Sequence, residues 1–348
     1  MQNKNPFTLM YGVSSSSIIS RNDNIGRILN SFMNEEAMYM YLISGIRGSG
    51  KTVLLKEIYK YLSNEKDWIT LDLNSQGDII TSLANKLFEK SRTNKLFEGW
   101  SLSINLHYLT LTKEKNEQIS DPEIIVENIF DKLKSNNKKL LITIDEVTNT
   151  KDFQKFVNFY QHLIGLDYPV YLLMTGLNEN INDIINDESL TFLSRAPKIE
   201  LDPLSLPNIA LEYMNIFDIA KEVAIKMAKL TNGYAFAYQV LGYLFYESKM
   251  KDLDENFLKK YDSYLWNNGY NKFWNDLTEN EKKFVIGLAK AKDGSKNEII
   301  DNSNLTESNF SQYRRRLIEK GLLYVEKYNC LKFVLPRFDE YVLFVKDF

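Results

Sequence analysis

Short apolar runs alternate with amphipathic stretches over the first 201 residues of the chain. The apolar runs cover residues 38–43, 68–73, 140–144 and 170–174. Runs this short and this apolar are typical of strands buried on both faces of a parallel sheet. Apolar positions at helical spacing occur instead in residues 24–32, 51–62, 79–90, 124–133 and 152–164. This alternation predicts an α/β fold in which helices cover both faces of a parallel sheet.

Two parts of the chain depart from this alternation. Residues 102–108 alternate between apolar and polar side chains, which predicts an edge strand or a hairpin. After a turn-rich junction at 202–207, the pattern is helical only as far as about residue 261. Three helical segments and two short alternating stretches, 322–325 and 331–334, then follow in the order of a winged helix. We therefore predict three domains, at residues 1–201, 202–266 and 267–348.

A glycine-rich loop joins the first apolar run to the helix that begins near Lys51. Glycines at three of its positions leave space for backbone N–H groups to surround a phosphate, and the N-terminal end of the next helix favours the same anion. Lys51 can reach the β and γ phosphates of a nucleotide, and the hydroxyl of Thr52 can bind Mg²⁺. An ordinary glycine-rich turn is disfavoured because a buried strand precedes the loop and a helix follows it. The predicted ATP and Mg²⁺ site consists of Gly45, Ile46, Arg47, Gly48, Ser49, Gly50, Lys51 and Thr52.

An acidic pair, Asp145 and Glu146, follows the apolar run at 140–144. Carboxylates at the carboxyl end of a buried parallel strand lie at the edge of the sheet where ligands bind. We assign Asp145 to the Mg²⁺ and Glu146 to the base that orients and polarises the attacking water. The alternative is that the pair caps the next helix.

The composition narrows the classes of function. The chain has 348 residues, 44% of them hydrophobic and 26% charged, and a formal net charge of −3, so any nucleic-acid surface must be a local patch. Cys330 is the single cysteine and His107 and His162 are the two histidines, which argues against a Cys/His zinc site. No apolar run has the length of a membrane span, and residues 1–17 lack the pattern of a signal peptide. We expect a cytoplasmic protein without a membrane partner.

These features together resemble the AAA+ ATPases of the initiator and origin-recognition type. More narrowly, the chain resembles a bacterial set of AAA-family ATP-binding proteins. The resemblance implies a P-loop NTPase core with a parallel sheet, followed by an all-α lid and a winged-helix domain. The stretches that carry it are residues 5–8, 18–21, 45–52, 141–147, 174–177, 192–196, 233–236 and 311–317.

The resemblance also implies roles for individual residues. Ile18, Ile19 and Arg21 correspond to the segment that lines the adenine pocket. Thr175 corresponds to the polar residue that senses the γ-phosphate, where Asn is more usual. Arg195 corresponds to the arginine that reaches the ATP of a neighbouring subunit, which implies a homo-oligomer; a surface or interdomain salt bridge is the alternative.

The chain departs from the AAA+ pattern in the lid. Many AAA+ lids carry an arginine that contacts the γ-phosphate, but residues 233–239 contain none. Slow hydrolysis, or a nucleotide that serves as a structural switch, is therefore compatible with the sequence.

The helix predicted at 307–320 is the candidate DNA-binding element. Its apolar stripe includes Phe310, Tyr313 and Leu317, and the other positions carry residue types that contact bases or phosphates. The leading hypothesis is an ATP-dependent switch that binds duplex DNA, in replication or in mobile-element transactions. A signalling or defence ATPase whose winged helix binds protein is the main alternative, and a small-molecule kinase is a third. The candidate DNA contacts are Ser311, Gln312, Arg315 and Arg316.

Overall fold

The computed structural model describes residues 4–10, 15–34, 39–93, 121–326 and 330–346. The strand or hairpin predicted at 102–108 lies outside these residues.

Five parallel strands form the sheet of the core, in the order β2-β3-β4-β1-β5. All four predicted strands within the described residues are present. The fifth strand, β5, was not predicted, because its three residues, Lys-Ile-Glu, contain one apolar side chain. The strands are β1 (Met40–Ser44), β2 (Trp68–Leu73), β3 (Lys139–Ile144), β4 (Val170–Gly176) and β5 (Lys198–Glu200).

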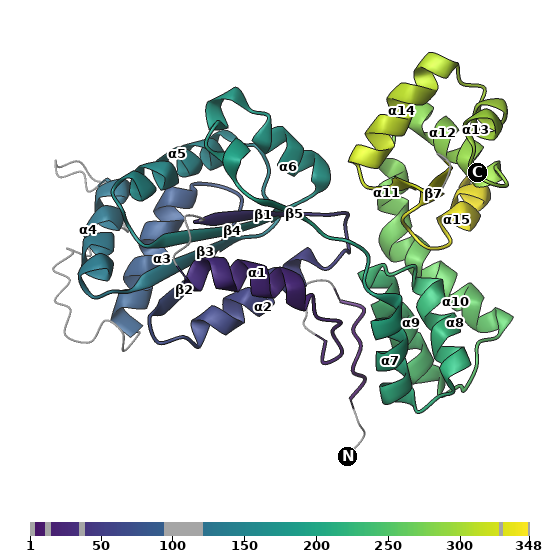
Figure 1. The fold of residues 1–348 in the computed structure, drawn as a ribbon, viewed down its shortest axis with the longest axis horizontal. Coiled ribbons are helices and arrows are strands. Elements are labelled where there is room, and N and C mark those ends of the chain that lie inside the picture. The colour runs from purple at the N-terminus through teal and green to yellow at the C-terminus, as the bar shows by residue number, and fades with distance from the viewer. Residues whose placement is uncertain (1–3, 11–14, 35–38, 94–120, 327–329, 347–348) are drawn as a thin grey trace, which may run out of the picture.

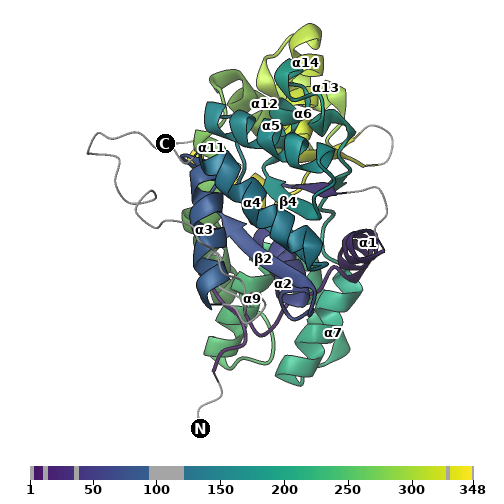
Figure 2. The ribbon, with the colours of Figure 1, turned by 90° about the vertical axis from the view of Figure 1, so that its left-hand side faces the viewer.

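Helices cover both faces of this sheet (Figures 1 and 2). One face packs against α1 (Asn22–Met33) and α2 (Lys51–Ser63), with Tyr41 and Ile43 of β1 in that core. The neighbouring residues Met40 and Leu42 face the opposite core. That face packs against α3 (Ile79–Thr93), α4 (Pro122–Ser135), α5 (Lys151–Gly165) and α6 (Asn178–Ile185). The predicted α/β layers are thereby confirmed.

The chain from residue 206 onward forms a second body beside the core in Figure 1. We call its first four helices the middle segment: α7 (Leu206–Phe217), α8 (Lys221–Thr231), α9 (Ala235–Ser248) and α10 (Glu255–Leu265). A π-helical turn, Trp266–Tyr270, and α11 (Asn271–Asn275) follow. We call the remainder the C-terminal segment: α12 (Glu279–Lys290), α13 (Lys296–Ser303), α14 (Glu307–Glu319), β6 (Leu323–Val325), β7 (Leu331–Phe333) and α15 (Phe338–Val345).

The two segments share one hydrophobic core and are joined by polar contacts. Arg337 binds Asp262 through two nitrogens, at 2.5 and 2.8 Å, and Asn232 donates to the carbonyl of Val334. The three helices and the antiparallel pair of β6 and β7 appear in the predicted order, whereas α15 was not predicted. None of the helices in the described ranges is both long enough and apolar enough to span a bilayer.

Candidate functional site

The loop between β1 and α2 has the backbone geometry of an anion cradle. Gly48 and Gly50 have φ of 74° and 95°, in the left-handed region that favours glycine. A Cβ at Gly45 would lie 2.7 Å from Oγ of Ser49. That Oγ is buried and has no hydrogen-bond partner among the described residues. The loop therefore keeps a buried polar atom that a bound anion can satisfy.

Lys51 is held inside the loop. Its ammonium donates to the carbonyls of Gly45 at 3.0 Å and Ile46 at 2.8 Å, and the residue is 8% exposed. Burial lowers the pKa of Lys51 to about 8, although Asp145 and Glu146 act in the opposite direction. A bound polyphosphate would stabilise the charged form of this lysine.

Asp145 connects the loop to β4. The hydroxyl of Thr52 donates to Oδ2 of Asp145 at 2.6 Å, and the hydroxyl of Thr175 donates to Oδ1. A hydroxyl and a carboxylate are the hard oxygen donors that suit Mg²⁺, which takes few protein ligands and shares the substrate's phosphates. No group of three or more acidic, His or Cys side chains that could hold a metal ion occurs among the residues that the structure describes. The donor set thus fits a nucleotide-bound Mg²⁺ and not an all-protein metal cage.

Glu146 is exposed and has a left-handed backbone, with φ of 55°. Its N–H donates to Asp145 Oδ1 at 3.1 Å and to Thr175 Oγ1 at 3.3 Å. The side chain of Thr150, and not the acidic pair, caps α5 by accepting from the N–H of Phe153 at 3.2 Å. The helix-capping alternative for Asp145 and Glu146 is therefore wrong.

The segment before α1 reaches the loop through Arg21. This guanidinium donates to the carbonyls of Ser49 at 3.0 Å and Asp202 at 2.6 Å, and burial lowers its pKa. Ile18 and Ile19 are half-buried, and Ile19 packs against the core of the middle segment. The structure thus places Arg21 on the side of the phosphate loop where the carbonyl of Ser49 points.

Arg195 lies apart from this cluster. It ends a single 3₁₀ turn, Leu193–Arg195, just before β5. Its side chain is exposed, and it forms no ion pair with the described part of the chain.

Two residues of the middle segment lie on the loop and were not predicted there. The hydroxyl of Tyr234 donates to the carbonyl of Arg47 at 2.8 Å, and the N–H of Phe236 donates to the carbonyl of Gly48 at 3.1 Å. Tyr234 is buried, and it contacts a loop 187 positions away, which no local pattern could indicate.

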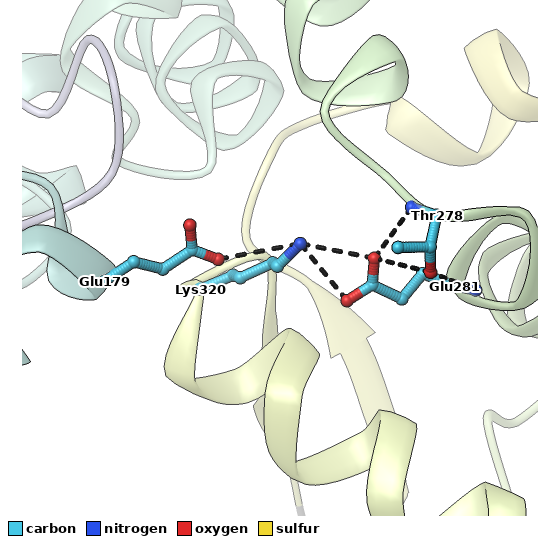
Figure 3. A network of polar contacts seen from close by, with 4 residues as sticks. All are labelled: Glu179, Thr278, Glu281 and Lys320. Atoms are coloured by element: carbon cyan, nitrogen blue, oxygen red, sulfur yellow. Dashed lines mark hydrogen bonds and ion pairs between the residues drawn. The ribbon is translucent and has the colours of Figure 1, made fainter. Parts of the chain in front are cut away.

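The C-terminal segment reaches the other side of the loop. A Cβ at Gly321 would lie 2.6 Å from Ile46 Cγ2 and 2.8 Å from Asn178 Nδ2, so the glycine makes this approach possible. Next to it, Lys320 lies 3.6 Å from Glu179 and 3.1 Å from Glu281 (Figure 3). Burial would raise the pKa of Glu281, but hydrogen bonds from Thr278 and Lys320 lower it overall.

The candidate DNA contacts Ser311, Gln312, Arg315 and Arg316 are exposed on α14, opposite the buried stripe of Phe310, Tyr313 and Leu317. Arg315 lies 3.7 Å from Glu319. Arg316 lines a groove between α6 and the C-terminal segment, together with Glu179, Asn182, Asp183, Thr278, Glu281, Glu319 and Lys320. Lys327, which follows β6 in the sequence, lies outside the described residues.

Comparisons with known proteins agree with this geometry. Residues 19–168 match a family described as an ATPase domain predominantly from Archaea, and residues 267–342 match a domain of unknown function. The chain is 26% identical over 256 residues to an uncharacterized ABC transporter ATP-binding protein of Methanocaldococcus jannaschii, covering 70% of this chain and 80% of that protein. An uncharacterized Haemophilus influenzae protein is 24% identical over 192 residues, which are 55% of this chain and 37% of that protein.

The fold is similar to that of the Aeropyrum pernix ORC2 protein. Its structure as ADPNP-ADP complexes has a TM-score of 0.61 at 13% identity, covering 97% of this chain and 96% of that chain. The structure of its ADP form has a TM-score of 0.53, with 97% of each chain covered. The sheet and the phosphate loop thus belong to a fold that the ORC2 structures share, and residues 19–168 resemble an ATPase domain.

Proposed function

We propose that this chain is an ATP-binding, Mg-dependent ATPase that acts as a nucleotide-controlled switch and contacts duplex DNA. The observation that carries the nucleotide part is the convergence of Lys51, Thr52 and Asp145 on a loop of left-handed glycines. The A. pernix ORC2 structures, which share the fold, contain ADPNP and ADP. In this proposal residues 1–201 form the ATPase core, 202–266 the lid and 267–348 a winged helix.

The residues of the site have separate roles in nucleotide binding and in hydrolysis. Lys51 and the loop N–H groups bind the phosphates, and Thr52 and Asp145 would hold Mg²⁺, which neutralises phosphate charge. The exposed carboxylate of Glu146 orients the attacking water and accepts its proton. Thr175 senses the γ-phosphate from its hydrogen bond to Asp145. Ile18 and Ile19 line the base pocket.

The contacts of the middle segment support a switch that hydrolyses ATP slowly. Residues 233–239 supply no arginine for the γ-phosphate, and Tyr234 and Phe236 bind the loop's backbone instead. Arg195 is exposed, as a residue that acts on a neighbouring subunit must be. We propose that subunits associate in the ATP-bound state and that hydrolysis is completed in trans.

DNA binding is assigned to α14. Its exposed Ser311, Gln312 and Arg315 occupy the face that a winged helix lays in the major groove, and Arg316 lies close enough to contact phosphate. A protein partner is the second candidate. It is favoured by Tyr324 and Val325 of β6, which are 39% and 42% exposed.

Calorimetric titration with MgATP tests the nucleotide part of this proposal. The wild-type chain should bind, and Lys51→Ala should abolish tight binding, because it removes the cation that faces the β and γ phosphates. Equal affinities in the two proteins would contradict the assignment of the loop.

A further inference from the structure

Three successive carbonyls of the phosphate loop are held from outside the loop. The carbonyl of Arg47 accepts from the hydroxyl of Tyr234 at 2.8 Å, and that of Gly48 accepts from the N–H of Phe236 at 3.1 Å. The carbonyl of Ser49 accepts from Arg21 at 3.0 Å. These donors come from the middle segment and from the segment before α1, two parts of the chain that lie outside the sheet.

This arrangement determines where the loop's N–H groups point. In a trans peptide the C=O and the following N–H point in opposite directions. When the carbonyls of Arg47, Gly48 and Ser49 are held outward, the N–H groups of the next residues therefore face inward. The N–H of Ser49 does so, since it donates to the carbonyl of Ile46 at 3.2 Å. The ammonium of Lys51 donates to the same carbonyl of Ile46. A bound phosphate would therefore take the place of this carbonyl as the acceptor for both the Ser49 N–H and the Lys51 ammonium.

The contacts are close and buried. Tyr234 is 3% exposed, and a Cβ at Gly48 would collide with its hydroxyl. Arg21 also donates to the carbonyl of Asp202 at 2.6 Å, in the junction that leads to the middle segment. These contacts hold the phosphate loop, the segment before α1 and the middle segment together at the phosphate site.

We infer that Tyr234 and Arg21 are positioning residues that hold the phosphate loop in the shape that accepts the β-phosphate. Through these two residues the middle segment responds to a β-phosphate bound in the loop, which both ADP and ATP supply. It does not respond to the γ-phosphate. The inference rests on the proposed nucleotide site and deepens it. Coupling of this kind would not need an arginine in the lid.

The test compares the affinities of full-length variants for ADP and for ATP. Tyr234→Phe removes only the hydroxyl, and a net hydrogen bond of this kind corresponds to about a two- to tenfold change in affinity. We expect the same fold-loss for ADP and for ATP. Tyr213→Phe is the matched control, because its buried hydroxyl donates to the carbonyl of Tyr238 at 2.8 Å, within the middle segment. The control should lose comparable thermal stability and keep both affinities.

Arg21→Lys provides an independent variant. It keeps the positive charge, but a single ammonium lacks the fork that spans the carbonyls of Ser49 and Asp202. Equal losses for ADP and ATP are again expected. A loss confined to ATP, unchanged affinities or tighter binding in both variants would overturn the inference. Failure of the wild-type chain to bind either nucleotide would instead overturn the proposed function.

Discussion

The ammonium of Lys320, at the C-terminal end of α14, lies 3.6 Å from the carboxylate of Glu179 in α6. Glu179 is four positions after Thr175, whose hydroxyl donates to Asp145. The end of the proposed DNA-binding helix therefore contacts α6 through Glu179 (Figure 3). This glutamate follows the residue proposed to sense the γ-phosphate by four positions in the sequence. A movement of β4 or α6 in response to nucleotide would reach α14 through this contact.

The two partners of Lys320 should differ in their effect on stability. Lys320→Ala leaves the carboxylate of Glu281, a residue 1% exposed, without its cation, which we expect to cost about 1–3 kcal/mol in the free energy of unfolding. Glu179→Ala removes a half-exposed partner, and exposed ion pairs contribute about 0–1 kcal/mol. Urea denaturation of both variants measures the difference. An equal cost would show that Glu281 does not depend on Lys320.

The pKa of Lys51 predicts how nucleotide affinity depends on pH. Its pKa is lowered to about 8, and only the charged form binds phosphate well. Affinity for MgATP should therefore be constant below about pH 8 and fall by up to about tenfold per unit above it. Calorimetry between pH 7 and pH 9.5, in buffers of different ionisation enthalpy, should detect proton uptake on binding. Lys51→Arg stays charged throughout, so any binding it retains should lack this decline.

Glu146→Gln should separate ATP binding from ATP hydrolysis. The amide keeps the size of the side chain but cannot accept the proton of water, so turnover should fall by about 100-fold or more. The affinity for MgATP should stay near that of the wild type, because the loop and Asp145 are untouched. Phosphate release and calorimetry measure the two quantities. Hydrolysis at the wild-type rate would exclude Glu146 as the base.

Arg195→Ala should lower hydrolysis only where subunits associate. Its exposed side chain would act on charge that develops at the γ-phosphate of a neighbour, so nucleotide binding by isolated subunits should be unaffected. Specific activity measured against protein concentration checks this. Arg27→Ala, at an exposed arginine of α1, is the control. A wild-type specific activity that does not change with concentration would contradict action in trans.

Local patterns were sufficient to predict the elements that carry the candidate site. The apolar run of β1, the glycines at 45, 48 and 50, and the acidic pair after β3 each lie within a few residues of the element that positions them. Two of the elements that were missed have weak local signals. β5 has three residues, and α6 is an eight-residue helix rich in Asn.

The contacts made across the chain could not be predicted. The hydroxyl of Tyr234 bonds to the carbonyl of Arg47, and Gly321 lies against Ile46. Both contacts join residues that are far apart in the sequence, and the periodicity of apolar positions does not indicate such pairs. Arg21 illustrates a different limit. The resemblance placed it near the base, and its hydrogen bonds place its guanidinium on the carbonyl side of the phosphate loop.

Titration of a labelled DNA duplex with the full-length chain, at several salt concentrations, tests the central claim of a nucleotide-controlled DNA switch most directly. Each titration is done without nucleotide, with ADP and with MgATP. Binding should tighten with ATP if linked subunits share one duplex, and the affinity should fall as salt rises. Neutralising Arg315 and Arg316 together to Gln should weaken binding and reduce the salt slope by about one unit for each lost phosphate contact. The fold should survive, because both side chains are exposed. A wild-type chain that ignores duplex DNA at low salt, with ATP and without it, would contradict the claim and favour the protein-binding alternative.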